Sequence, residues 1–383
     1  MELTINEDLF GPIWKYIQDE NVTDIKWNGS TLWIDDLTKG RYMAYTDEEY
    51  MDEKGNVIRG HNPLKLNEEW VKIFTSKVAN SVNENFNITE PSLKAETDEL
   101  RIQAEHYSVS GDSTIAFAIR KTPSVSRLAG KKLSDTGYAT PLVEKLLPCL
   151  MRAHCSGIIT GDVGSGKTEL EKYLVKFIPD EDGIITVEDT LEMKIKKLYP
   201  WKDVYSMKVS EQFETDAAIK DALRLLTKWL IISESRGKDI ARVMEGASTG
   251  CCALTSIHAE NVWQIPDRIM SMIGDDAQVG FENDVFTFFN YAIKVKVDKS
   301  QGKITRHIDQ IAFFDRDSEG KKNSITVFVE NGKWTGKPIP NRIYQRFIVN
   351  NEVEFLEYYQ EQIRLYNEEV RRLQAQRQTQ ERR

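Results

Sequence analysis

The sequence predicts an α/β protein in which a doubly wound parallel sheet carries a glycine-rich loop, with a smaller α+β domain before it and a helical tail after it. Three observations predict this arrangement. Short apolar runs alternate with amphipathic helical patterns between residues 137 and 315. One of these runs leads directly into the segment GDVGSGKT at residues 161–168. A polar stretch at residues 123–136 has the composition of a linker and separates this region from residues 1–122.

The first domain, residues 1–122, mixes helical and strand patterns. A helical pattern at residues 11–20 is followed by two strands that flank an Asn28-Gly29 hairpin turn. Residues 40–63 are polar and indicate a long hairpin or loop. Residues 68–86 predict a helix whose apolar face consists of Trp70, Ile73, Phe74, Val78 and Val82. Alternation at residues 98–106 and 113–121 predicts two strands that place Arg101 and Arg120 opposite their apolar neighbours.

The second domain, residues 137–315, supplies the parallel sheet. Apolar strands covered on both faces by crossover helices are typical of such sheets. We expect strands at residues 157–160, 184–188, 229–233 and 252–257, and an antiparallel hairpin over residues 291–314 at the edge of the sheet.

Residues 316–383 indicate a hairpin and an amphipathic helical tail. Apolar residues from Leu356 to Leu373 alternate three and four positions apart, which is heptad spacing over only two to three heptads. Such a helix packs on its own domain, packs on a neighbouring subunit, or forms a short coiled coil, and the sequence favours the first two.

Composition narrows the class of protein. The chain has 383 residues, 40% hydrophobic content and a net charge of −9, which argues against a nucleic-acid surface along the whole chain. Apolar runs of membrane-spanning length and a basic-then-apolar leader are both missing from the sequence, so we expect a cytoplasmic protein. The four cysteines lack C-x-x-C spacing and indicate reduced core residues without a metal.

The glycine-rich segment matches the phosphate-binding pattern G-x-x-x-x-G-K-[ST] and has the flanks that this pattern requires. A strand precedes it and a helix follows it, so backbone N–H groups and the positive helix end point at one phosphate. Lys167 would reach the β- and γ-phosphates of ATP, and the Thr168 hydroxyl would hold Mg²⁺. The predicted nucleotide-binding residues are the loop and the residue after it: Gly161, Asp162, Val163, Gly164, Ser165, Gly166, Lys167, Thr168 and Glu169.

Acidic side chains follow two of the predicted strands. Glu188 and Asp189 come after the strand at 184–188, and Glu234 comes after the strand at 229–233. Ligands of open α/β sheets bind where strands end, and phosphate hydrolysis needs a carboxylate that orients water. The alternative is that each acid is a helix cap or a surface charge.

His258 ends a further apolar strand and is either a γ-phosphate sensor or a hydrogen-bonded structural residue. Arg101 and Arg120 are either solvated strand residues or a pair that binds phosphate in a bidentate manner.

These segments, in this order, resemble the secretion ATPase superfamily, the hexameric motors of type II and type IV secretion, conjugation and type IV pilus systems. The loop corresponds to Walker A, ITVEDTLEM to the aspartate box, IISESRG followed by Thr249-Gly250 to the Walker B region, and TSIHAEN to the histidine box. The segments ELRI and AIRK resemble those that carry the phosphate-binding arginines of the family. The resemblance covers residues 85–315 and is strongest for the branch that serves type IV secretion, conjugation and tight-adherence pili.

The resemblance implies a RecA-like motor domain joined by a linker to a smaller N-domain, assembled as a ring of six with ATP between the domains. Closure would bring Arg101 and Arg120 onto the phosphates. Glu234 would position or activate water, Glu188 would assist it or act through the magnesium shell, and His258 would relay the state of the γ-phosphate. Expected partners are inner-membrane and coupling components of the machine at the cytoplasmic face of the membrane, without sequence-specific binding of nucleic acid.

Two rival interpretations remain open. Lys228 stands where family members often carry an acid, and Ser233 stands where they often carry glycine before the glutamate. These departures motivate a nucleotide-gated scaffold with little turnover. A DNA-translocating RecA-like motor is disfavoured by the acidic balance of the chain.

Overall fold

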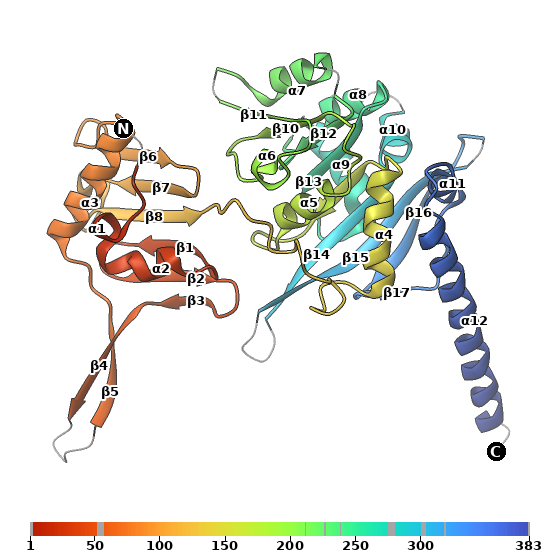
Figure 1. The fold of residues 1–383 in the computed structure, drawn as a ribbon, viewed down its shortest axis with the longest axis horizontal. Coiled ribbons are helices and arrows are strands. Elements are labelled where there is room, and N and C mark those ends of the chain that lie inside the picture. The colour runs from red at the N-terminus through yellow and green to blue at the C-terminus, as the bar shows by residue number, and fades with distance from the viewer. Residues whose placement is uncertain are drawn as a thin grey trace. The chain divides into compact units, whose positions relative to one another are not determined.

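The computed structural model describes residues 3–51, 57–210, 212–225, 227–237, 239–274, 280–299, 304–317 and 319–381. The chain divides into two compact units (Figure 1). Unit 1 comprises Met1–Ser124 and Asp298–Thr305, and unit 2 comprises Val125–Val297 and Arg306–Arg383. Each unit has its own hydrophobic core: unit 1 has one cluster of buried apolar residues, and unit 2 has two among the described residues.

Unit 1 contains a six-stranded sheet in the order β3-β2-β1-β8-β7-β6, in which each strand is antiparallel to its neighbours. Its helices bury one face of the sheet, where Phe10 and Phe74 of the helices pack with Phe117 of the sheet, and the other face carries polar side chains. Its strands are β1 (Val22–Trp27), β2 (Leu32–Asp36), β3 (Gly40–Met43), β6 (Ser92–Glu96), β7 (Leu100–Glu105) and β8 (Ala116–Lys121), with β4 (Tyr45–Met51) and β5 (Val57–Pro63) as a separate hairpin. Its helices are α1 (Glu7–Phe10), η1 (Gly11–Ile13), α2 (Trp14–Gln18), α3 (Glu68–Ser81) and η2 (Tyr107–Val109).

The Asn28-Gly29 turn is confirmed, because β1 and β2 pair around it and Gly29 has a φ of 96°. Residues 40–63 are strands β3, β4 and β5, and residues 52–56 of that prediction lie outside the described residues. The predicted face of α3 is partly wrong. Ile73 is 47% exposed, whereas Val71 is buried in its place, because Phe74 and Val78 already fix the side of the helix that packs on the sheet.

Unit 2 is a nine-stranded sheet in the order β11-β10-β12-β13-β9-β14-β15-β16-β17. The first six strands in this order are parallel to one another, and the predicted strand positions are confirmed to within one residue. They are β9 (Gly157–Thr160), β10 (Ile184–Glu188), β11 (Val204–Lys208), β12 (Trp229–Ile232), β13 (Cys252–Ile257) and β14 (Tyr291–Asp298).

The sheet is mixed, and the predicted edge position of the 291–314 hairpin is wrong. β14 pairs in parallel with β9 in the interior of the sheet, because its alternating apolar residues are buried in the cores on both faces, Tyr291 and Ile293 in one and Ala292 in the other. The sheet continues through β15 (Thr305–Arg316), β16 (Asn323–Glu330) and β17 (Lys333–Trp334), of which β16 pairs antiparallel with both neighbours.

Helices cover both faces of this sheet (Figure 1). One core lies under α4 (Pro141–Arg152), α5 (Lys167–Val175), α6 (Ile195–Leu198), α11 (Asn341–Val349) and α12 (Val353–Glu381). The other lies under α7 (Thr215–Arg224), α8 (Asp239–Ser248), η3 (Val262–Gln264), α9 (Ile265–Ile273) and α10 (Phe281–Phe288). The four cysteines are buried free thiols in these cores.

The tail helix α12 packs on its own unit over its first four turns. Phe355 and Tyr359 are buried, and the Tyr366 hydroxyl donates to the Thr335 carbonyl oxygen at 3.3 Å. Farther along, Leu373 is 51% exposed. Among the helices that the structure describes, α12 included, length and apolar character never combine to the degree that a bilayer crossing requires.

Candidate nucleotide-binding site

The glycine-rich loop lies between β9 and α5, and its glycines have the backbone geometry that the pattern requires. Gly164 and Gly166 have φ values of 75° and 98°, in the left-handed region that favours glycine. A side chain at Gly161 would collide with the carbonyl oxygen of Val295 in β14. The Ser165 hydroxyl oxygen is buried and finds no hydrogen-bond partner among the described residues. The loop therefore has the backbone form of a phosphate cradle and carries a buried polar atom without a partner among the described residues.

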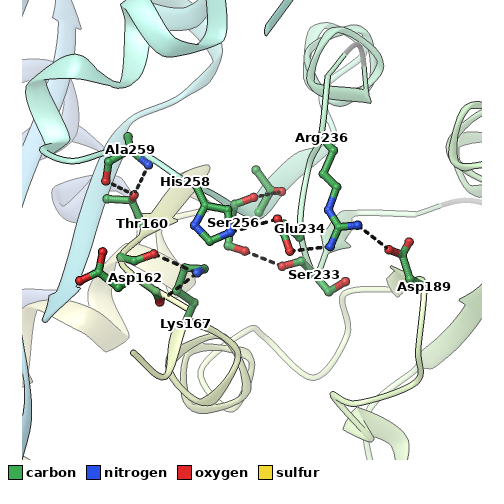
Figure 2. Close-up of polar contacts among 12 residues, drawn as sticks. Thr160, Asp162, Lys167, Asp189, Ser233, Glu234, Arg236, Ser256, His258 and Ala259 are labelled. Atoms are coloured by element: carbon green, nitrogen blue, oxygen red, sulfur yellow. Dashed lines mark hydrogen bonds and ion pairs between the residues drawn. The ribbon is translucent and has the colours of Figure 1, made fainter. Parts of the chain in front are cut away.

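Lys167 begins α5 and points back into the loop. Its Nζ donates to the Gly161 carbonyl oxygen at 2.9 Å and to the Asp162 carbonyl oxygen at 3.4 Å (Figure 2). Burial lowers the pKa of Lys167, and the charges of Glu234 and Glu171 oppose that change. The ammonium group is therefore held inside the cradle by the carbonyl groups of the loop itself.

Glu234 follows β12 and lies within electrostatic reach of Lys167. Its Oε2 accepts a hydrogen bond from Arg236 Nη2 at 2.9 Å, and its Oε1 lies 3.2 Å from His258 Nε2 (Figure 2). The hydrogen bond from Arg236 is the main reason why the pKa of Glu234 is lowered. The carboxylate is therefore ionised and oriented at neutral pH.

Arg236 was not singled out by the sequence, although it lies within the Walker B-like segment. Besides Glu234, its guanidinium group contacts the Asp189 carboxylate at 3.5 Å. It thus joins the loops that follow β10 and β12 (Figure 2). Its position two residues after the glutamate is the only sequence signal that could have indicated this role.

Glu188 has a different environment from Glu234. Its side chain is 2% exposed and accepts hydrogen bonds from the Thr186 hydroxyl at 3.1 Å and the Met193 N–H at 2.9 Å. Burial raises its pKa in spite of these hydrogen bonds. The structure therefore buries this carboxyl at the end of β10, where it holds the segment that follows the strand. Its assignment to water activation or the magnesium shell stays a prediction.

The strand ends that carry these residues are joined by side-chain hydroxyls. The Thr160 hydroxyl donates to the Ala259 carbonyl oxygen at 2.8 Å and accepts from the Ala259 N–H at 2.9 Å. The Ser256 hydroxyl donates to the Ser233 carbonyl oxygen at 2.5 Å. The carboxyl ends of β9, β13 and β12 are thus connected beside the phosphate cradle (Figure 2).

Glu171 is the other residue that the sequence did not indicate. It lies one turn after Lys167 on α5, has no solvent exposure, and neither carboxyl oxygen has a hydrogen-bond partner among the described residues. Burial, followed by the charge of Glu188, raises its pKa well above the ordinary value. Its surroundings behind the phosphate loop therefore favour the uncharged form of the acid.

Arg101 and Arg120 belong to unit 1. They are directly opposite each other in the β7–β8 pair, on the polar face of the sheet, as the alternation predicted. Arg120 Nε donates to Asp24 at 2.8 Å, and Arg101 Nε lies 3.7 Å from Glu96. Their proposed contact with phosphate stays a prediction.

Comparisons with known proteins agree with this fold. The model of the family described as "Type II/IV secretion system protein" matches residues 92–308. An uncharacterised protein of Bacillus anthracis is 26% identical over 339 residues, which is 85% of this chain and 72% of that protein. A putative conjugal transfer protein of Mycobacterium tuberculosis is 22% identical over 212 residues, which is 54% of this chain and 58% of that protein.

Solved structures show the same fold. The Legionella pneumophila ATPase DotB aligns with a TM-score of 0.56 and 17% identity over 78% of each chain. The pilus retraction motor PilT with bound ADP aligns with a TM-score of 0.55 and 18% identity over 94% of this chain and 89% of PilT. Because the family match spans more than half of the sequence and the mixed sheet with its amino-terminal unit has the fold of these proteins, the chain belongs to the Type II/IV secretion system ATPase family.

Proposed function

We propose that this chain hydrolyses ATP as one subunit of a hexameric motor that powers a type IV secretion, conjugative transfer or pilus assembly machine. The motor would act at the cytoplasmic face of the membrane on inner-membrane and coupling components. The observation that carries the proposal is the placement of Lys167 and Glu234: Lys167 Nζ lies on the carbonyl oxygens of the phosphate loop, and Glu234 follows β12 and is held by Arg236 and His258.

The geometry of this pair supports hydrolysis. Phosphoryl transfer depends mainly on positioning and on fixed charges around the phosphates. On phosphate binding, Lys167 would exchange its hydrogen bonds to loop carbonyl groups for phosphate oxygens. Glu234, fixed by Arg236 and His258, would orient the attacking water. His258 would report the presence of the γ-phosphate to the segment that follows β13.

The residues present also fit a magnesium ion. The Thr168 hydroxyl lies in the first turn of α5, beside the cradle, and would be a protein ligand of Mg²⁺. Clusters of three or more His, Cys, Asp or Glu side chains that could hold a metal are absent from the described residues. Magnesium in nucleotide sites takes most of its ligands from water and phosphate, so one hydroxyl is compatible with it. Bound there, the ion would neutralise charge on the phosphates.

The two units would act together in this cycle. Arg101 and Arg120 form a matched pair on one exposed sheet face of unit 1. We propose that closure of the units on ATP brings both guanidinium groups onto phosphate oxygens, which converts binding energy into movement.

Steady-state phosphate release by the full-length chain tests the proposal. Lys167→Ala and Glu234→Gln should each reduce turnover by about 100-fold or more, because each removes a fixed charge or the water-orienting group. Exposed Lys333→Ala and Glu330→Gln are matched controls of the same chemistry outside the site. Equal release by all five proteins, measured with membranes of the host machine present, would exclude hydrolysis.

One observation favours the rival function, a nucleotide-gated scaffold with little turnover. Both Glu234 oxygens are already engaged, and the lowered pKa makes this carboxylate a weak base. In a scaffold, Glu234→Gln would retain ATP-dependent ring assembly and full biological function. In a motor, the Glu234→Gln variant would still assemble in the presence of ATP but would lose biological function.

A further inference from the structure

A second group of polar residues lies on the outer rim of the phosphate loop. Arg306, near the start of β15, donates from Nε to the Gly164 carbonyl oxygen at 3.2 Å. Its Cδ lies 3.6 Å from the position that a Cβ of Gly166 would take. The Arg306 side chain therefore runs along the loop, and its guanidinium group is at the rim of the cradle.

The backbone of Arg127, in the segment before α4, is anchored beside the same loop. Its backbone N–H donates to Glu169 Oε2 at 2.9 Å, directly after the Gly-Lys-Thr of the loop. The other Glu169 oxygen accepts from Lys172 Nζ at 3.0 Å, so this anchor is itself fixed.

The positive charges of the Arg127 and Arg306 guanidinium groups interact. The pKa of Arg306 is lowered first by burial and then by the positive charge of Arg127. Like charges in a partly buried place repel, and an anion between them removes the repulsion. Guanidinium groups match phosphate oxygens well, because they donate two parallel hydrogen bonds.

Tyr138 provides an independent indication of a ligand. Its ring is 6% exposed, and its buried hydroxyl finds no hydrogen-bond partner among the described residues. Its carbonyl oxygen accepts from the Ile308 N–H at 2.8 Å, so it is fixed beside the strand that carries Arg306. Burial and the charge of Glu169 raise the pKa of Tyr138, and Arg306 opposes them. A buried hydroxyl without a partner is a group that a ligand oxygen can satisfy.

We propose that Arg127 and Arg306 bind phosphate oxygens of the nucleotide from the outer rim of the loop, and that the Tyr138 hydroxyl donates to the same ligand. This inference rests on the proposed function, because it adds binding residues to the same nucleotide site. It differs from the contact proposed for Arg101 and Arg120, since all three residues belong to unit 2.

Calorimetric titration of the full-length chain with ATP, ADP and AMP tests the inference. Arg127→Ala and Arg306→Ala should each weaken ATP binding by about 10-fold or more. The ATP affinity of Arg306→Lys should lie between those of Arg306→Ala and the wild type, because lysine keeps the charge but lacks the planar guanidinium group. Arg364→Ala is the control, since Arg364 is engaged with Glu361 and Glu368 on the surface of α12. The melting temperature without nucleotide identifies any variant that fails to fold.

A second variant separates ligand binding from a structural role. Tyr138→Phe removes only the hydroxyl, so the nucleotide-free melting temperature should stay equal or rise, while the stabilisation by saturating ATP should decrease. An unchanged ATP-induced stabilisation would remove the hydroxyl from the site. If Lys167→Ala abolishes ATP binding while the arginine variants bind as the wild type does, the rim inference is wrong and the proposed function stands. If Lys167→Ala also binds ATP as the wild type does, the rim inference and the proposed function both fail.

Discussion

Two acids, one at the end of β10 and one just after β12, look alike in the sequence and differ in the structure. Glu188 is buried, accepts hydrogen bonds from its own loop and has a raised pKa. Glu234 is partly exposed, contacts Arg236 and His258, and has a lowered pKa. The same pattern of an apolar strand followed by an acid therefore produces one carboxyl suited to holding a loop and one suited to acting on a ligand.

The largest expected difference between the two acids is in turnover. Glu234→Gln should reduce kcat by about 100-fold or more, because the water-orienting carboxylate is lost. Glu188→Gln should reduce kcat by less than about 10-fold, because an amide still fits the polar interior of its loop. Phosphate release by both variants under saturating ATP measures the difference. Equal losses would show that the burial of Glu188 does not separate the two roles.

Truncation of the buried acid should affect stability instead. Glu188→Ala leaves the buried Met193 N–H without its present acceptor, and the Thr186 hydroxyl keeps only its hydrogen bond to Ser206, so the free energy of unfolding should fall by about 1–3 kcal/mol. Glu330→Ala on the exposed end of β16 should change it by less than about 0.5 kcal/mol. Urea unfolding at pH 7 compares the variants. A loss no greater than that of the control would contradict the assigned loop-holding role.

Glu171 extends the comparison to a carboxyl with no hydrogen-bond partner among the described residues. Its pKa is raised in the folded protein, so the stabilisation from holding its proton is complete below the unfolded pKa of about 4.3 and is lost as pH rises toward the folded value. Glu171→Gln should therefore gain stability over the wild type as pH rises above about 5, by at most about 1.4 kcal/mol per pH unit. Urea unfolding at several pH values tests this. A difference that is constant with pH would show that Glu171 is ionised in the folded chain.

The smallest expected effect on turnover concerns Arg236, the partner that lowers the pKa of Glu234. Arg236→Gln removes the main cause of its lowered pKa, so the acid limb of the kcat–pH profile should move to higher pH. Turnover at neutral pH should fall by no more than about 10-fold, since His258 still contacts the carboxylate. The pH profile of phosphate release measures both effects. If the acid limb of the profile does not shift in Arg236→Gln, a group other than Glu234 controls it.

The sequence predicts the loop and the strand ends that surround the site, but it does not predict which side chains contact one another there. The glycine-rich loop and the strand ends at Glu188, Glu234 and His258 follow from local patterns, because each depends on residues close together in the chain. The amino-terminal hairpin and the facing arginines follow from turn chemistry and period-two alternation.

What the sequence missed depends on contacts between distant segments. Glu171 lies in the charged segment ELEK at the start of α5, whose composition is typical of a solvated helix face, yet it is buried. Arg306 lies 142 positions from the loop residue that it contacts. The rotation of α3 that buries Val71 and exposes Ile73 is likewise set by packing on the sheet, since both choices give an amphipathic helix.

The double hydrogen bond between Thr160 and Ala259 has a mechanical consequence. One hydroxyl both donates to and accepts from the backbone of the residue after His258. The peptide groups on either side of Ala259 therefore cannot turn without breaking a bond to the last residue before the phosphate loop. Rearrangement of the loop around a departing phosphate would consequently tilt the histidine segment in the same step, so that chemical state and shape change together within a single subunit.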